Sequence, residues 1–191
     1  RKRAPKIGIG KEILQMIHIV DYGLGNIQAF VTMYKRLGIE TVRATAAEDL
    51  RDVRKLILPG VGAFDHAMEL LDASGMRHPL EQLVREGKVP VLGICVGMQI
   101  LAYSSEEGVG AGLGWVDGRV RSFSGDPASA ALPMPHMGWN DVVPAAGSPL
   151  FKGLEDDARF YFLHSYYFEC ADPANVAAKA DYGFQFDCAV Q

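Results

Sequence analysis

The sequence predicts an α/β protein: an open, mostly parallel sheet flanked by helices, with an antiparallel extension in its second half. Three observations lead to this prediction. Short apolar runs that suit buried strands alternate with amphipathic helical segments as far as about residue 108. Glycine-bearing turns follow three of these runs. Beyond residue 108 the chain alternates apolar and polar residues, which is typical of antiparallel strands.

The first half carries four predicted strands and five predicted helices. The strands are expected at 17–20, 40–45, 55–62 and 89–94, and the helices at 27–38, 47–54, 64–75, 78–87 and 97–108. Gly38, Gly75 and Gly87 stand where helices should stop. In the second half, 112–123 predicts an antiparallel hairpin, and 133–143 and 159–170 predict further strands.

Composition places the chain among globular proteins of one domain. Hydrophobic residues make up 49% of the 191 residues and charged residues 22%, which is enough for a substantial core. The net charge of −4 argues against nucleic acid or an anionic membrane as a partner, and no apolar stretch approaches the length of a membrane span. We expect residues 1–15 to be a leader or an added extension, or else a native arm, and residues 16–191 to form the domain.

Cysteine usage indicates a reducing compartment. The three cysteines, Cys95, Cys170 and Cys188, are an odd and widely spaced set. This argues against a disulfide framework and a Cys-rich zinc site, and it favours the cytoplasm.

Cys95 stands in the segment "VLGICVGMQ", between a predicted strand and a predicted helix. Gly-x-Cys-x-Gly in that position matches a nucleophile elbow, because the two glycines let the backbone turn tightly. The N-terminus of a helix favours a thiolate, and the N–H of Val96 is placed to bind an oxyanion. The segment "LPGVG", which also ends a strand, could supply the other half of the oxyanion hole. The alternatives are a small buried core cysteine and a plain tight turn.

A cysteine nucleophile needs a base, usually a histidine oriented by a carboxylate. His18 lies within the first predicted strand, and His66 and His78 are expected to be solvated. His136 and His164 lie in the late strands and could face the cleft. None of the five is followed by an evident orienting carboxylate.

Five motifs in order resemble the class I (triad) glutamine amidotransferases. They are "IVDYGLGN", "LPGVGAF", "VLGICVGMQIL", "PHMGWN" and "FLHSYYF", and the resemblance runs from Met16 to Gln191. Within that family the chain is similar to glutaminase subunits that pass ammonia to a cyclase subunit with a (β/α)8 barrel, in histidine biosynthesis. The resemblance implies that a cysteine attacks the carboxamide of glutamine, forms a glutamyl thioester and releases ammonia. It implies no cofactor and no metal.

The resemblance also assigns residues. Cys95 would be the nucleophile; Val61, Gly62 and Val96 would form the oxyanion wall. Glutamine would be bound by Gly62, Gln99, His164, Ser165 and Tyr166. The cyclase would face Pro135, Met137, Trp139 and Asn140, although Trp139 without the resemblance reads as a partly buried core aromatic.

One family motif, Gly-x-Gln-Phe-His-Pro-Glu, which carries the base and its orienting Glu, does not occur in this sequence. "YGFQFDCAVQ" matches four of its positions, but Asp187 stands where the His belongs. We therefore expect this segment to correspond to an earlier strand and the 191-residue chain to end one strand early. Weak glutamine hydrolysis and an unpaired sheet edge would follow. The rival hypothesis makes His164 the base.

Three other functions stay open at this point. One is a paralogous amidotransferase that supplies ammonia in surface-sugar biosynthesis. Another is a non-catalytic subunit that only stabilises or regulates its partner. The third is a cysteine hydrolase such as a peptidase, which "PHMGWN" argues against.

Overall fold

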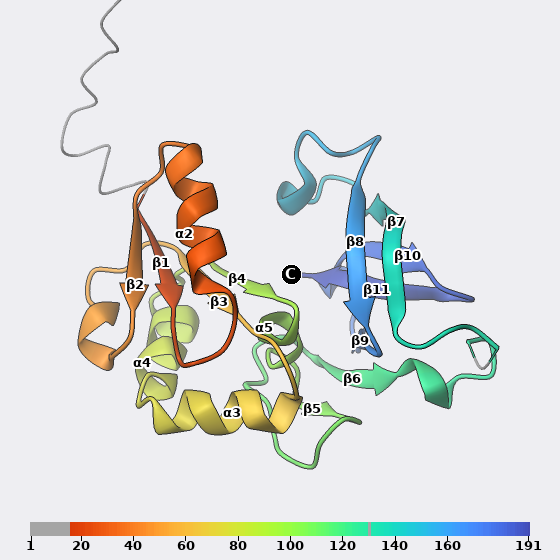
Figure 1. Cartoon of the computed structure of the whole chain (residues 1–191), viewed down its shortest axis with the longest axis horizontal. Coiled ribbons are helices and arrows are strands. Elements are labelled where there is room, and N and C mark those ends of the chain that lie inside the picture. The colour runs from red at the N-terminus through yellow and green to blue at the C-terminus, as the bar shows by residue number, and fades with distance from the viewer. Residues whose placement is uncertain (1–15, 130) are drawn as a thin grey trace, which may run out of the picture. The chain divides into compact units, whose positions relative to one another are not determined.

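The computed structural model describes residues 16–129 and 131–191 (Figure 1). The predicted leader, residues 1–15, lies outside the described residues. Contacts within the backbone divide the chain into two compact units. Among the described residues, the first comprises 16–62 together with His66–Met98, and the second comprises Ala63–Asp65, 99–129 and 131–191. Each unit has a sheet of its own, so the predicted α/β class with an antiparallel second half is confirmed.

The first unit contains a four-stranded sheet in which every pair is parallel. Its strands are β1 (Ile17–Val20), β2 (Thr41–Ala44), β3 (Leu56–Pro59) and β4 (Val91–Ile94), in the order β2-β1-β3-β4. Every residue of β1 and β3 is buried, as expected of apolar runs in a covered parallel sheet. Helix α2 (Ile27–Arg36) packs Ile27 against Ile17, Ile19 and Ile57 on one face of this sheet.

Two of the three helical segments that follow differ from the prediction. Helix α3 (Phe64–Ala73) agrees with the prediction, but segment 47–54 forms only a 3-10 turn, η1 (Ala47–Leu50), because Arg51 is extended and Asp52 adopts a φ of 57°. Segment 78–87 divides into α4 (Arg77–Glu81) and a π-helical turn, η2 (Gln82–Glu86).

The predicted helix 97–108 is wrong beyond its first turn. Helix α5 covers only Val96–Gln99. The carbonyl groups that would continue it accept hydrogen bonds from a later loop instead: Ala102 from Gly114 at 3.0 Å and Tyr103 from Gly112 at 3.0 Å. A Cβ at Gly112 would overlap the Ala102 carbonyl oxygen, so glycine permits this approach. Backbone pairing with the loop thus replaces helical pairing.

The second unit contains a seven-stranded sheet. Its strands are β5 (Ser104–Ser105), β6 (Gly118–Ser122), β7 (His136–Pro144), β8 (Arg159–His164), β9 (Tyr166–Cys170), β10 (Val176–Asp181) and β11 (Gln185–Val190), in the order β5-β6-β9-β11-β10-β7-β8. The pairs are antiparallel except β5 with β6. The hairpin predicted at 112–123 is wrong, since β6 pairs with β5 and β9. Short 3-10 turns follow: η3 (Phe123–Gly125), η4 (Pro149–Phe151) and η5 (Pro173–Asn175).

Aromatic side chains fill the core of the second unit. Phe123, fully buried, lies with its ring 5.1 Å from that of Phe186 and 4.7 Å from that of Tyr167. Small residues of β10, Ala178 and Ala180, complete this core. The change of sheet type, predicted near residue 108, falls earlier, between β4 and β5.

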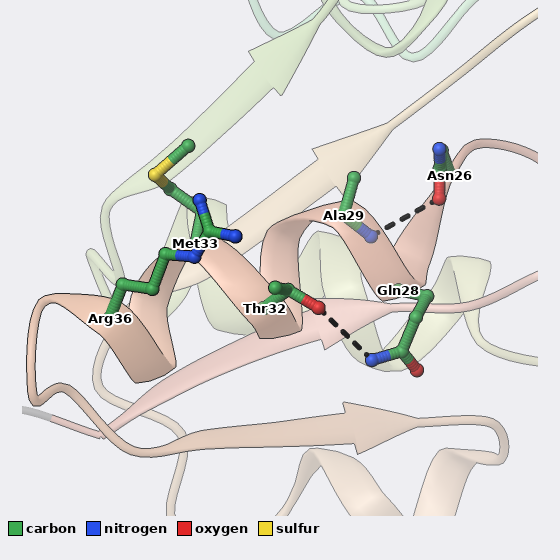
Figure 2. Close-up of a pocket in the computed structure, with 6 residues that line it drawn as sticks. All are labelled: Asn26, Gln28, Ala29, Thr32, Met33 and Arg36. Atoms are coloured by element: carbon green, nitrogen blue, oxygen red, sulfur yellow. Dashed lines mark hydrogen bonds between the residues drawn. The ribbon is translucent and has the colours of Figure 1, made fainter.

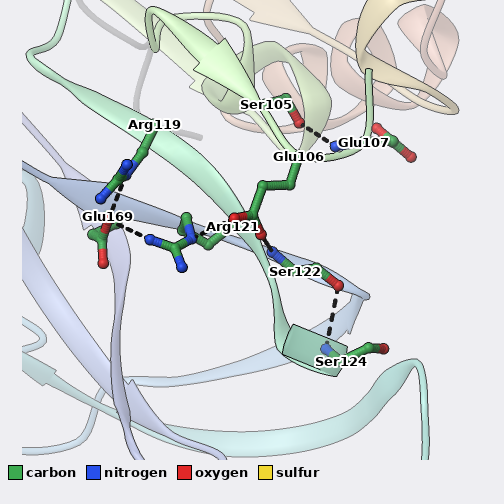
Figure 3. A network of polar contacts seen from close by, with 8 residues as sticks. All are labelled: Ser105, Glu106, Glu107, Arg119, Arg121, Ser122, Ser124 and Glu169. Carbon is green, nitrogen blue, oxygen red and sulfur yellow. Dashed lines mark hydrogen bonds and ion pairs between the residues drawn. The ribbon is translucent and has the colours of Figure 1, made fainter. Parts of the chain in front are cut away.

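Ion pairs tie the β5–β6 end of this sheet together (Figure 3). The Arg121 guanidinium lies 2.7 Å from a Glu106 oxygen and 3.3 Å from Glu169, which also pairs with Arg119 at 2.8 Å. The Glu106 carboxylate accepts the N–H of Ser122 at 2.7 Å. These groups are partly exposed, so the network orders the segment more than it stabilises the fold. In the described chain, none of the helices combines the length and the apolar character needed to cross a bilayer.

Candidate active site

Cys95 occupies the sharp turn between β4 and α5. Its φ is 57°, in the left-handed region that non-glycine residues rarely adopt, and its side chain is exposed. A strained nucleophile turn at the carboxyl end of a parallel strand is the geometry of a nucleophile elbow. The alternative of a small buried core cysteine is therefore wrong.

Three glycines allow the elbow to form. A Cβ at Gly93 would lie 2.6 Å from the Gly97 carbonyl oxygen, and a Cβ at Gly97 would overlap the Leu58 carbonyl oxygen. Gly60, which the sequence analysis did not single out, touches the backbone of Val96 and Gly97 in the same way. The "LPGVG" turn and the elbow thus meet backbone against backbone, as turns at the carboxyl ends of neighbouring parallel strands can do.

In the described part of the chain, three backbone N–H groups of the "LPGVG" turn and the elbow are free to donate hydrogen bonds. Among the described residues, no group accepts a hydrogen bond from the N–H of Val61 or of Gly62, which has a φ of 88°. The N–H of Val96 is the first of α5 and has no acceptor within the helix. All three belong to the first unit, as does Cys95. Free backbone N–H groups of this kind can stabilise an oxyanion.

Gln99 and the "HSY" segment make one hydrogen-bonded group in the second unit. The Gln99 side chain is buried, and its Nε2 donates to the Tyr166 carbonyl at 3.3 Å. His164 Nδ1 lies 2.9 Å from the same oxygen. Ser165 stands between β8 and β9, and its carbonyl accepts the N–H of Phe123. These hydrogen bonds hold the backbone of His164–Tyr166 in one conformation. That this segment binds the substrate stays a prediction.

His136, which is buried, and His164, which is partly buried, form a pair. Their ring nitrogens, Nδ1 of His136 and Nε2 of His164, are 2.9 Å apart. Since a carbonyl only accepts, His164 Nδ1 carries the proton that it gives to Tyr166, so its Nε2 accepts from His136. Burial lowers the pKa of His164 to about 4 and also lowers that of His136.

The pair argues against His164 as the base, because both of its nitrogens are already engaged within the second unit. The other histidines do not replace it. The strand register pairs His18 with Leu56 of β3, which in turn pairs with Val91 at the start of β4. His18 therefore lies at the opposite end of the sheet from Cys95, which follows the end of β4. His66 and His78 are exposed, as predicted.

The outer face of β7 and β8 carries four exposed apolar side chains, here called the apolar strip. Register pairs Met137 with Leu163 and Trp139 with Tyr161, and their exposed fractions are 63%, 60%, 64% and 54%. Period-two alternation explains this, because the intervening residue Gly138 and the histidine pair face the other side. Trp139 as a core aromatic is therefore wrong.

The two remaining predicted interface residues differ from each other. Pro135, just before β7, is exposed. Asn140 is partly buried, and its side chain donates to the Asp181 carbonyl at 2.7 Å. It therefore has a structural role inside the second unit. The apolar strip described above is a contiguous exposed apolar surface, and such a surface commonly marks a protein-binding face.

An open hollow of about 400 Å³ lies on the outward face of α2 (Figure 2). Its lining is Asn26, Gln28, Ala29, Thr32, Met33 and Arg36. Asn26 caps the helix through the N–H of Ala29, and Gln28 bonds Thr32 one turn on. None of the predicted site residues lines it. In the described part of the chain, no cluster of His, Cys, Asp and Glu could hold a metal ion.

The family model for "Glutamine amidotransferase class-I" matches residues 18–186. A protein of Bdellovibrio bacteriovorus named imidazole glycerol phosphate synthase subunit HisH is 64% identical over 175 residues, which cover 92% of this chain and 86% of that protein. Proteins with the same name from Leptospira interrogans, at 49%, and Pseudomonas aeruginosa (HisH 2), at 43%, match 92% of this chain and 86% and 85% of their own lengths.

Solved structures agree at the level of fold. A crystal structure of a glutamine amidotransferase matches with a TM-score of 0.64 and 20% identity, covering 89% of this chain and 88% of that one. A structure of PurLQS from Thermotoga maritima matches with a TM-score of 0.61 and 16% identity, covering 87% of this chain and 74% of that one.

Proposed function

This chain belongs to the class I glutamine amidotransferases, and from that premise we propose that it is the glutaminase subunit of imidazole glycerol phosphate synthase. The relatives that carry this subunit name match 92% of the chain at up to 64% identity. The observation that carries the chemistry is the exposed Cys95 at a φ of 57° on the turn from β4 into α5. The subunit works in histidine biosynthesis, in the cytoplasm, without a cofactor.

The reaction begins when the Cys95 thiolate attacks the carboxamide carbon of glutamine. A C–S bond forms, and the carboxamide oxygen becomes an oxyanion that accepts hydrogen bonds from N–H groups of Val61, Gly62 and Val96. The C–N bond then breaks, and the amine leaves as ammonia after taking up a proton. Water attacks the thioester, releases glutamate and returns the thiol.

Gln99, His164, Ser165 and Tyr166, with Gly62, bind the glutamine in this proposal. The hydrogen bonds of Gln99 and His164 to the Tyr166 carbonyl support a fixed backbone at "HSY", which could hold the α-amino and α-carboxyl groups. The base is not assigned to any of the five histidines, because the family motif that carries it does not occur in this sequence.

The partner is a cyclase subunit with a (β/α)8 barrel, and we assign its docking face to the apolar strip with Pro135. The strip is apolar at its centre and ends in the ion pair of Asp141 with Arg159 at 3.5 Å. An apolar centre with a polar rim is the usual anatomy of a protein interface.

The test is glutamate release from glutamine by the full chain mixed with the cyclase subunit, with Cys95→Ser as the control. We expect release that requires both Cys95 and the partner, together with incorporation of the amide nitrogen into the product of the cyclase. Binding of the cyclase without Cys95-dependent release would identify a non-catalytic subunit. Nitrogen transfer only with a partner of surface-sugar synthesis would identify the paralogue.

A further inference from the structure

The turn that follows β1, residues 21–26, has no part in the reaction described above. It nevertheless contains a buried aromatic residue: Tyr22 is 4% exposed. The Tyr22 hydroxyl donates a hydrogen bond of 2.8 Å to the carbonyl oxygen of Pro59. The same turn touches Pro59 a second time, since a Cβ on Gly25 would lie 2.9 Å from the Pro59 Cβ.

Pro59 is the last residue of β3, so its carbonyl belongs to the peptide that leads into the Gly60–Gly62 turn. A peptide is planar, so a hydrogen bond that fixes the direction of the Pro59 carbonyl also fixes the direction of the Gly60 N–H. It thereby fixes the orientation in which the Gly60–Gly62 turn begins. On its other side this turn is held by the contact of Gly60 with Val96 and Gly97. Tyr22 thus supplies the one side-chain hydrogen bond that the described residues make to Pro59.

Tyr22 keeps its proton at neutral pH. Burial raises the pKa of Tyr22 to about 12, and the nearby Cys95 thiolate acts in the same direction. The hydroxyl is therefore a permanent donor to the Pro59 carbonyl.

From these contacts we infer that Tyr22 is a positioning residue. Its hydrogen bond to Pro59 holds the Gly60–Gly62 turn so that the N–H groups of Val61 and Gly62 are aimed at the oxygen of the carbonyl that Cys95 attacks. The inference rests on the proposed function, and it extends that function to a residue that does not touch glutamine. A merely structural Tyr22 would support the first unit as a whole without favouring the reaction of Cys95 with a carbonyl substrate.

The test compares two thiol reagents on the full chain bound to the cyclase subunit, the state in which the proposed function expects glutamine turnover. One is 6-diazo-5-oxo-L-norleucine, whose ketone oxygen takes the place of the glutamine carboxamide oxygen. In its reaction the S–H proton moves to the diazo carbon, a C–S bond forms, and the C–N bond breaks as N₂ leaves. The other is iodoacetamide, whose rate of alkylation depends only on the exposure and reactivity of the Cys95 thiol. Peptide mass mapping reports Cys95 alone, and burial, which raises the pKa of Cys170 and Cys188 to about 12, keeps those thiols slow.

Tyr22→Phe removes the hydroxyl and keeps the ring. We expect it to slow labelling by the diazoketone about tenfold, less than the loss of an oxyanion donor itself would, and to leave the iodoacetamide rate unchanged. Tyr34→Phe is the matched control in the same unit, because among the described residues no hydrogen bond uses the Tyr34 hydroxyl. It should leave both rates unchanged.

Each other outcome contradicts the inference. An unchanged diazoketone rate in Tyr22→Phe would show that the hydrogen bond does not position the turn. An equal fall with both reagents would make Tyr22 a structural residue only. A wild-type chain that, in the presence of the cyclase subunit, iodoacetamide labels at Cys95 and the diazoketone does not would refute the proposed glutaminase, and the positioning role with it.

Discussion

The nucleophile turn and the β7–β8 pair position their functional groups by different means. At the nucleophile turn, the backbones of Gly60, Gly93 and Gly97 pack where no side chain fits, and Cys95 accepts a φ of 57°. In β7 and β8, side chains decide, because alternation directs the histidine pair inward and the apolar strip outward. The difference teaches that the first region tolerates no added volume, whereas the second is sensitive to charge and to the loss of contact area.

The largest effect is expected from Gly97→Ala. The new Cβ would overlap the backbone carbonyl oxygen of Leu58, which cannot move without distorting β3. Overpacking in a core costs about 1–3 kcal/mol, and a clash with backbone should reach about 3 kcal/mol or more. We expect lower stability in urea denaturation and no labelling of Cys95 by a glutamine analogue.

Gly125→Ala is the control for this prediction. Gly125 has open space around its Cβ position and no positive φ, so the change should stay within about 0.5 kcal/mol. If Gly97→Ala were as stable and as reactive as Gly125→Ala, the backbone account of the elbow would be wrong.

A smaller effect is expected when the histidine pair is protonated. The folded state lowers the pKa of His164 from 6.5 to about 4 through burial, so between these values the unfolded chain binds more protons. The contribution of neutral His164 to the free energy of unfolding is fully present above pH 6.5 and is lost as the pH falls towards 4. The total loss is about 3 kcal/mol. Urea midpoints measured at several pH values between 7.5 and 4 give the curve.

Two variants sharpen this prediction. His164→Gln should reduce the loss of stability between pH 6.5 and 4, because the titrating imidazole is removed. His78→Gln removes an exposed histidine and should leave the curve as in the wild type. A His164→Gln curve as steep as that of the wild type would assign the acid sensitivity to other groups.

The smallest effect on the isolated chain is expected from Trp139→Ala, since this side chain is 64% exposed. Its ring packs edge-on against Tyr161, with centroids 5.8 Å apart, and little else would be lost. We expect stability to change by less than about 1 kcal/mol, while affinity for the cyclase falls by about 2 kcal/mol, as at an aromatic hot spot. Calorimetric titration measures the affinity. Val109→Ala, at a fully exposed position outside the strip, should leave it unchanged.

Sequence by itself determined the α/β class, the four parallel strands and the place of Cys95 on a strand-to-helix turn, because buried apolar runs, glycine stops and Gly-x-Cys-x-Gly are local signals. The family motifs pointed to the same reaction. Only the tertiary structure decided that the segment after Gln99 leaves the helix, since the loop at 112–114 competes for its carbonyl groups. It also decided that Tyr22 reaches Pro59 and that His164 is engaged on both nitrogens. These contacts join residues up to 37 positions apart, and the hydrogen bonds that fix them have no counterpart in local propensity or periodicity.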